Sequence, residues 1–308
     1  MSIEKRQFVS RETAAGSAKW LVVLLGLAWG FNWVAARFIL EALPPWTMRA
    51  LGIGLGALTL FAAAAISGIR LSIPRSDRLK VVIAGFFNVA AFGVCSAYAQ
   101  VYGTTSRAIV IAYSMPIWAA LLARIVLKER LNAIKLVALS LCAAGLTILI
   151  WPLARAGLPF GALLALGCAW SWAAGTIYLK WAKIEAPTLT AAAWQLLFGW
   201  LMLAAGMIVF DGWPQLSPLP GSVVAWIAYN GLIGMGLAYF LWFVVIDRLP
   251  TTTASLGSLL VPVIGVIASA LVIGERPGFT DVIGFALIFA AAACVLLQPN
   301  VKHDELPE

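Results

Sequence analysis

Long apolar runs separated by short polar breaks constrain the fold of this chain more than any other feature. A helix needs about 20 apolar residues to cross a bilayer. The breaks carry proline, glycine and charged residues, and they leave no room for a domain outside the membrane. The pattern predicts an all-α integral membrane protein with ten transmembrane helices, at 20–40, 46–67, 79–101, 106–127, 134–151, 159–179, 188–210, 222–246, 253–273 and 280–297.

Composition excludes the main soluble classes and most catalytic centres. Apolar residues make up 62% of the chain and charged residues 11%, whereas soluble domains have about 45–50% and about 25%. The four cysteines lie in apolar runs without a CxxC pair, and the one histidine, His303, lies in the polar tail. No acidic residue lies in the middle of a run. We therefore expect no catalytic residue, no metal site and no cofactor, and the chain is not predicted to be an enzyme.

The distribution of lysine and arginine predicts the orientation. Of the 21 basic residues, fifteen fall at breaks on one side of the predicted membrane, three on the other side and three within runs. Cytoplasmic loops carry the excess of such residues. Both termini are then cytoplasmic, as tails of residues 1–18 and 299–308. The net charge of +8 is explained by this asymmetry, so we expect no nucleic-acid partner.

The two halves of the chain repeat one another. Pro116 precedes Glu129 by 13 residues, as Pro262 precedes Glu275, and the offset between the copies is 146. At the same offset, GTTSRA at 103–108 matches LPTTTA at 249–254. The repeats are predicted at 19–152 and 153–298. Each holds five spans, an odd number, so the second copy enters the membrane from the opposite side, as in many secondary transporters.

These features resemble the ten-helix EamA-domain branch of the drug/metabolite transporter superfamily. The resemblance rests on AWG at 28–30, Arg49 early in the second run, both Pro–Glu pairs and the duplication. It implies a basket in which spans one to four and six to nine surround a central cavity, with spans five and ten at the side. The family exports amino acids, drugs and other metabolites. The aromatic-rich first, third and sixth spans resemble exporters of aromatic amino acids.

Helical phase nominates the side chains that would line such a cavity. Trp29 and Trp170 occupy matching places in the repeats at offset 141, so we expect them to face each other. Asn32 and Trp33 share a helical stripe with Trp29. The other candidates are polar or aromatic side chains at membrane depth, for which hydrogen bonding between helices is an equal alternative to substrate contact: Asn88, Phe92, Tyr98, Tyr113, Tyr239 and Ser258.

A second group of residues is predicted to act in gating. Arg37, Glu41 and Arg49 would form a polar cluster at the outer mouth, with snorkelling of the arginines to the interface as the alternative. Pro116 and Pro262 would interrupt spans four and nine as hinges, with a simple kink as the alternative. The cavity itself is expected to carry no net charge. A substrate carboxylate would then be held by Asn32 or by a freed helix N-terminus.

Together, these observations predict a secondary transporter of the bacterial inner (plasma) membrane. It would export small amphipathic metabolites, above all aromatic and other neutral amino acids, by alternating access between inverted repeats. Its partners would be this small-molecule substrate and the lipid bilayer, with no obligate protein partner. Export of cationic or hydrophobic drugs and a passive metabolite channel are the alternatives. The missing mid-span acid argues against cationic drugs and against proton coupling through a buried carboxylate.

Overall fold

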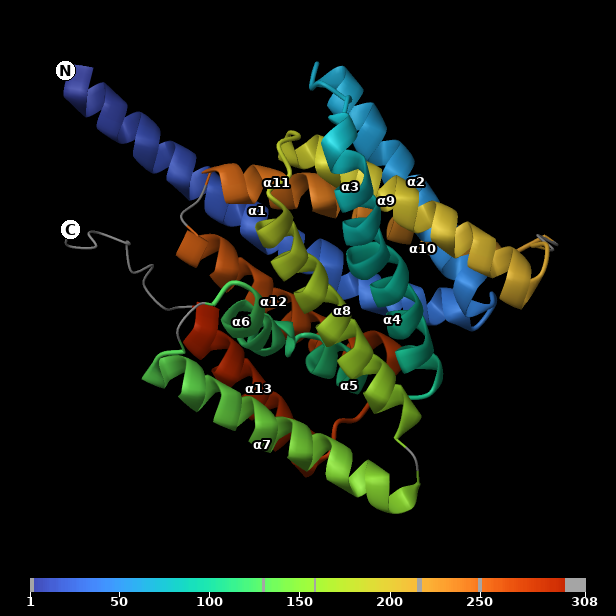
Figure 1. Cartoon of the computed structure of the whole chain (residues 1–308). Coiled ribbons are helices and arrows are strands. Elements are labelled where there is room, and N and C mark those ends of the chain that lie inside the picture. The colour runs from blue at the N-terminus through green and yellow to red at the C-terminus, as the bar shows by residue number, and fades with distance from the viewer. Residues whose placement is uncertain (1–2, 129–130, 158, 215–217, 249–250, 297–308) are drawn as a thin grey trace.

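The structure is a computed structural model that describes residues 3–128, 131–157, 159–214, 218–248 and 251–296. Within these ranges, side chains are described except at 3–19, 243, 245–248, 251–259 and 295–296. Every regular element of this part of the chain is helical (Figure 1). The all-α prediction is therefore confirmed.

The helical elements group into ten spans, numbered here in chain order, in which η marks 3-10 or π-helical segments. The first repeat comprises α1 (Ile3–Leu40), α2 (Pro45–Ile66), η1–α3–η2–α4 (Arg75–Asp77, Arg78–Gly85, Phe86–Ala91, Phe92–Val101), α5–α6 (Thr105–Ala112, Met115–Val126) and α7 (Ala133–Ala156). The second comprises α8 (Phe160–Ala182), α9–η3 (Thr188–Gly206, Met207–Asp211), α10–η4–α11 (Gly221–Ala228, Tyr229–Leu237, Ala238–Arg248), α12–η5 (Thr251–Ala268, Ser269–Ile273) and α13 (Phe279–Leu296).

The predicted spans agree with these helices. Within the described part of the chain, eight spans are long and apolar enough to cross a membrane. Spans nine and ten contain the shorter apolar stretches Leu260–Ile273 and Phe279–Cys294. The third span begins earlier than predicted, at Arg75, and α1 continues into the predicted tail as far as Ile3. In Figure 1, the N-terminal part of α1 projects beyond the other helices.

The two prolines expected to interrupt spans four and nine have different surroundings. Span four breaks at Tyr113 and Ser114, and Pro116 lies in the first turn of α6, where its missing N–H costs no helical hydrogen bond. Pro262 lies inside α12, which continues to Ala268. The expectation of a matched interruption is therefore wrong for span nine. Its irregular part, the π-helical η5, comes later in the span.

The helix contacts follow an approximate twofold pattern that exchanges the two repeats. Span one packs on span nine as span six packs on span four, and span two packs on span eight as span seven packs on span three. Spans two and seven contact each other, as do spans five and ten. In Figure 1, α7 and α13 lie side by side at the lower edge of the bundle. Gly145 and Gly284 meet in this pair, where an added Cβ on either would lie within 3.2 Å of the other's carbonyl oxygen.

Spans three and eight both change helix type in mid-membrane. Phe86–Ala91 and Tyr229–Leu237 are π-helical, and each segment contains an asparagine, Asn88 and Asn230. A π segment widens the turn by one residue and shifts the side chains that follow around the helix axis. Such segments occur often at functional sites. In both spans, residues of the segment and residues that follow it line the central cavity.

A candidate substrate cavity between the repeats

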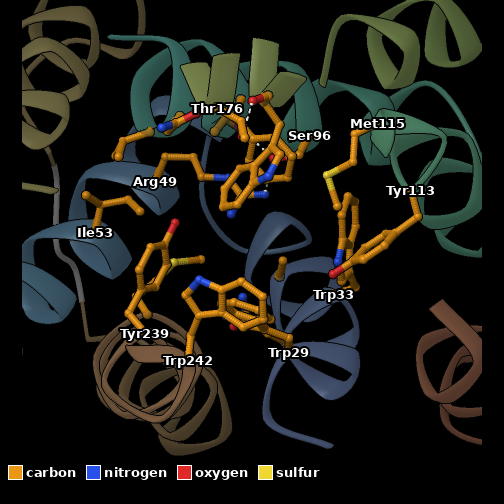
Figure 2. A pocket seen from close by; sticks show the side chains of 18 of the residues that line it. Trp29, Trp33, Arg49, Ile53, Ser96, Tyr113, Met115, Thr176, Tyr239 and Trp242 are labelled. Atoms are coloured by element: carbon orange, nitrogen blue, oxygen red, sulfur yellow. Dashed lines mark hydrogen bonds between the residues drawn. The ribbon is translucent and has the colours of Figure 1, made fainter. Parts of the chain in front are cut away.

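A cavity of about 280 Å³ is lined, among the described side chains, by six of the ten spans. Both repeats contribute to it, the first with four spans and the second with spans six and eight. Figure 2 shows the labelled side chains around this space. The lining residues are Trp29, Asn32, Trp33, Ala36, Arg49, Ile53, Asn88, Val89, Phe92, Gly93, Ser96, Tyr113, Met115, Pro116, Ala119, Trp172, Thr176, Met235, Tyr239 and Trp242.

Aromatic rings form two clusters on this lining. Trp29 stands edge-on to Tyr239, with ring centroids 5.7 Å apart, and lies 5.9 Å from Trp242. One turn along α1 from Trp29, Trp33 lies 6.5 Å from the ring of Phe92, and that ring lies 5.3 Å from Trp172. We call these groups the Trp29 cluster and the Trp33 cluster. Both have the edge-to-face geometry that favours further aromatic contacts, so the cavity suits a flat apolar group.

Arg49 gives this cavity a positive charge. Its side chain is only 4% exposed, and Nη2 donates a 2.8 Å hydrogen bond to Ser96 Oγ, which in turn donates to the carbonyl of Gly93. The buried Nε has no hydrogen-bond partner among the described residues. In Figure 2, Arg49 extends from α2 into the same space as Tyr239. The expectation of an uncharged cavity is therefore wrong.

Two asparagines link helices beside the cavity. Asn230 Nδ2 donates to Asn32 Oδ1 at 2.7 Å, and Asn88 Nδ2 donates to Gln195 Oε1 at 3.2 Å. The amide oxygens of Asn32 and Asn88 press against Gly234 and Gly175, where an added Cβ would come within 2.1 and 1.9 Å of them. Both amides therefore join helices of opposite repeats. For Asn88, this is the alternative to substrate contact that the sequence left open. Asn32 has this role in addition to its place on the cavity.

Most of the nominated cavity residues lie where helical phase put them: Trp29, Asn32, Trp33, Asn88, Phe92, Tyr113 and Tyr239. Trp170 does not. It is 44% exposed, and its ring packs 5.1 Å from Trp118. The expectation that it faces Trp29 is wrong, because Trp172 and Thr176 form the cavity face of α8 and a residue two positions earlier points about 200° away.

Two further nominations lie outside the cavity or outside the described part. Tyr98 is not among the lining residues, and its ring stacks on Tyr102 at 6.1 Å. The side chain of Ser258 lies outside the described residues. The sequence reasoning did not nominate Ser96, although it follows Asn88 and Phe92 on one helical stripe. That spacing could have identified it.

The expected cluster of Arg37, Glu41 and Arg49 is only partly present. Arg37 Nε lies 3.5 Å from Glu41 Oε1, and Arg37 Nη1 donates to the carbonyl of Gln100 at 2.9 Å. Arg49 instead turns into the cavity and bonds to Ser96. Although Arg49 lies near the start of α2, its side chain is part of the cavity and not of the outer mouth.

Carboxylates of the second repeat bind the first repeat at one end of the bundle, which we call the Glu275 end. Glu275 accepts hydrogen bonds from Thr105 N at 2.6 Å, Ser106 N at 2.8 Å and Ser106 Oγ at 2.5 Å, at the start of α5. Asp281 forms a two-pronged ion pair with Arg107, at 2.6 and 3.0 Å. Because a helix N-terminus favours negative charge, Glu275 holds span four in place here.

Similar contacts between the start of one helix and the opposite repeat occur at both ends of the bundle. At the Glu275 end, Asp211 Oδ2 accepts from Thr47 N at 2.7 Å and from its hydroxyl at 2.9 Å. At the other end, Asp77 Oδ2 accepts from Glu185 N at 2.9 Å, and Thr190 donates to the carbonyl of Arg70 at 2.7 Å. The contacts of Thr47 and Thr190 join spans two and seven near both ends, and Asp77 ties the start of span three to the segment before span seven.

Comparison with known sequences decides the family. The sequence model of the EamA-like transporter family matches residues 16–151 and again 159–297, one match for each repeat. The chain belongs to this family. It is therefore a multi-pass membrane transporter of the drug/metabolite transporter superfamily and not an enzyme, as the resemblance implied.

Relatives and a solved structure cover nearly the whole chain. The chain is 24% identical over 271 residues to an uncharacterized transporter, YoaV, of Bacillus subtilis, covering 87% of this chain and 92% of that one. It is 24% identical to a probable amino-acid metabolite efflux pump of Escherichia coli, covering 87% and 91%. A crystal structure with 23% identity matches at a TM-score of 0.63, covering 91% of this chain and 97% of the other. This last match supports the fold.

Proposed function

We propose that this transporter exports aromatic and other neutral amino acids. The observation that carries the proposal is the cavity between the repeats, whose two aromatic clusters can hold a flat side chain between them. Aromatic contacts of this geometry each contribute about 0.5–1.5 kcal/mol beyond the burial of area. The relatives described as probable amino-acid metabolite efflux pumps support the same substrate class.

Transport proceeds by alternating access, in which the two repeats rock about the cavity. The contacts of Glu275 with span four hold one side closed. In sequence, the duplication matches Glu129 with Glu275 and LPTTTA at 249–254 with GTTSRA at 103–108, so the chain carries a counterpart of this pair for the opposite side. Spans two and seven are joined near both ends, by Thr47 with Asp211 and by Thr190 with the carbonyl of Arg70, so in this scheme they form the part about which the others move.

The orientation of the chain in the membrane determines which side of the transporter the contacts of Glu275 close. With both termini cytoplasmic, as the basic residues predict, the Glu275 end faces outward and the substrate enters from the cytoplasm. The described part of the chain places no acidic side chain on the cavity, so transport runs without a proton-carrying carboxylate there. Release outside then requires the contacts of Glu275 to open.

The test is counterflow of labelled phenylalanine into liposomes that contain the purified protein. Saturable counterflow that is stereoselective and independent of a pH gradient is the expected result. Non-saturable flux would indicate a channel, and accumulation driven by the gradient would show proton coupling. If active, folded protein moves neither phenylalanine nor tryptophan, the proposed substrate class is wrong, and hydrophobic drugs and other metabolites become the next panel.

A further inference from the structure

We infer that Arg49 is the anchor for the substrate's carboxylate, and that the cavity selects solutes with an anionic group attached to an aromatic or apolar body. The inference rests on the proposed export of amino acids and names how they are recognised. It replaces Asn32 and a helix N-terminus as the expected carboxylate partners, because Arg49 brings a full positive charge and an Nε without a partner among the described residues.

Arg49 forms no ion pair among the residues that the structure describes. Among the side chains that the structure describes on the cavity, none is an aspartate or a glutamate. Arg49 is 4% exposed, and an uncompensated cation at such a position in a membrane protein is costly. An anionic substrate removes this cost when it binds, because it brings the missing charge.

The hydrogen bonds of the guanidinium leave room for a ligand. Arginine has five N–H donors, and Ser96 takes one of them from Nη2. The neighbouring Nε is buried without a partner among the described residues. Ser96 is fixed in turn by its bond to the carbonyl of Gly93, so the guanidinium is oriented before a substrate arrives. A planar guanidinium held in this way matches the geometry of a carboxylate.

The surroundings of Arg49 supply the rest of the specificity. Figure 2 shows Arg49, Tyr239 and Trp242 around one space, with Trp29 beside them. A ligand whose carboxylate lies at Arg49 can place its aromatic ring between the Trp29 and Trp33 clusters and an ammonium over an aromatic face. A cation without a carboxylate meets the positive charge of Arg49 with nothing to neutralise it. The cavity therefore discriminates against cationic drugs.

Three probes separate the parts of this ligand without altering the protein. Phenylalanine carries both charges, 3-phenylpropionate carries only the carboxylate, and phenethylamine carries only the ammonium. Equilibrium dialysis of each labelled probe against the purified transporter in detergent measures binding directly. We expect both carboxylates to bind wild-type protein and phenethylamine to bind at least about tenfold more weakly.

Variants then assign the effect to Arg49. Arg49→Gln should weaken both carboxylates at least about 30-fold, and Arg49→Lys less, because lysine keeps the charge and loses the fork. Arg124→Gln is the control, since this arginine of α6 is exposed and does not line the cavity. Elution volume and melting temperature establish whether each variant is folded. If Arg49→Gln does not fold, the three probes on wild-type protein still test whether binding depends on the carboxylate.

The outcomes separate this inference from the proposed function. Phenethylamine binding as tightly as 3-phenylpropionate, or Arg49→Gln binding both carboxylates as wild type does, overturns the role of Arg49 and leaves amino-acid export standing if phenylalanine is transported. Absence of phenylalanine counterflow, together with Arg49-dependent binding of 3-phenylpropionate, overturns amino-acid export and supports a carboxylate site for another solute.

Discussion

Replacing Glu275 by glutamine tests whether its contacts hold one side of the transporter closed. The carboxylate accepts three hydrogen bonds at the start of α5, and glutamine retains one acceptor oxygen while presenting an amide to the other donors. Hydrogen bonds to a charged group contribute about 1.5–3 kcal/mol when buried, and at this partly buried site we take about 1 kcal/mol each. The lost charge at the helix N-terminus adds about 0.3–1 kcal/mol.

The closed state should therefore lose about 2–3 kcal/mol relative to the open one. Every 1.4 kcal/mol changes an equilibrium about tenfold, so the populations should shift about 30- to 150-fold. The assay is the distance distribution between spin labels at Tyr102→Cys and Phe279→Cys, two exposed positions on opposite sides of the contact, in a background without the native cysteines. We expect a longer distance to appear in Glu275→Gln.

Glu185→Gln is the matched control, because this exposed side chain lies at the other end of the bundle and the substitution keeps the backbone N–H that bonds to Asp77. It should leave the distance distribution unchanged. If Glu275→Gln keeps the wild-type distribution and the wild-type counterflow rate, the contacts of Glu275 do not set the closed state, and the reasoning from its three hydrogen bonds is refuted.

Two further predictions concern the cavity. Gly175→Ala places a methyl group 1.9 Å from Asn88 Oδ1, so the asparagine must move. The melting temperature of this variant should fall by several degrees. Gly221→Ala is the control, because the space around its added Cβ is open, and it should leave the melting temperature unchanged. Trp172→Ala should weaken phenylalanine binding about tenfold, whereas Trp170→Ala should change it less than about twofold. Equilibrium dialysis measures both. Equal effects of the two substitutions would contradict the assignment of Trp172 to the cavity face of α8.

The number of spans, the duplication and much of the cavity could be predicted from the sequence, because each depends on a periodic signal. Apolar runs of membrane length identify the spans, and a helical stripe such as Trp29, Asn32 and Trp33 identifies a face. The offset of 146 between the Pro–Glu pairs identifies the repeat. These signals are local or regular, and packing in the folded protein does not alter them.

The predictions that were wrong concern side chains whose direction depends on packing between helices. Trp29 and Trp170 match in sequence, but the repeats have diverged, and α8 turns Trp172 to the cavity instead. Arg49 lies one turn into α2, and Ser96 of another span draws it inward rather than to the mouth. The π segments of spans three and eight depend on contacts between helices and have no signature that a sequence reading detects.

Those π segments also bear on small insertions and deletions. Each residue of an α-helix turns the chain by about 100°, so losing one residue from an ordinary stretch reorients every side chain that follows. Within Phe86–Ala91, loss of one residue would instead convert the wide turn to an ordinary one, and Phe92 and Ser96 would keep nearly the same direction toward the cavity. A gene of this family could thus lose one codon here and reshape the turn that carries Asn88, while α4 keeps its packing on α8.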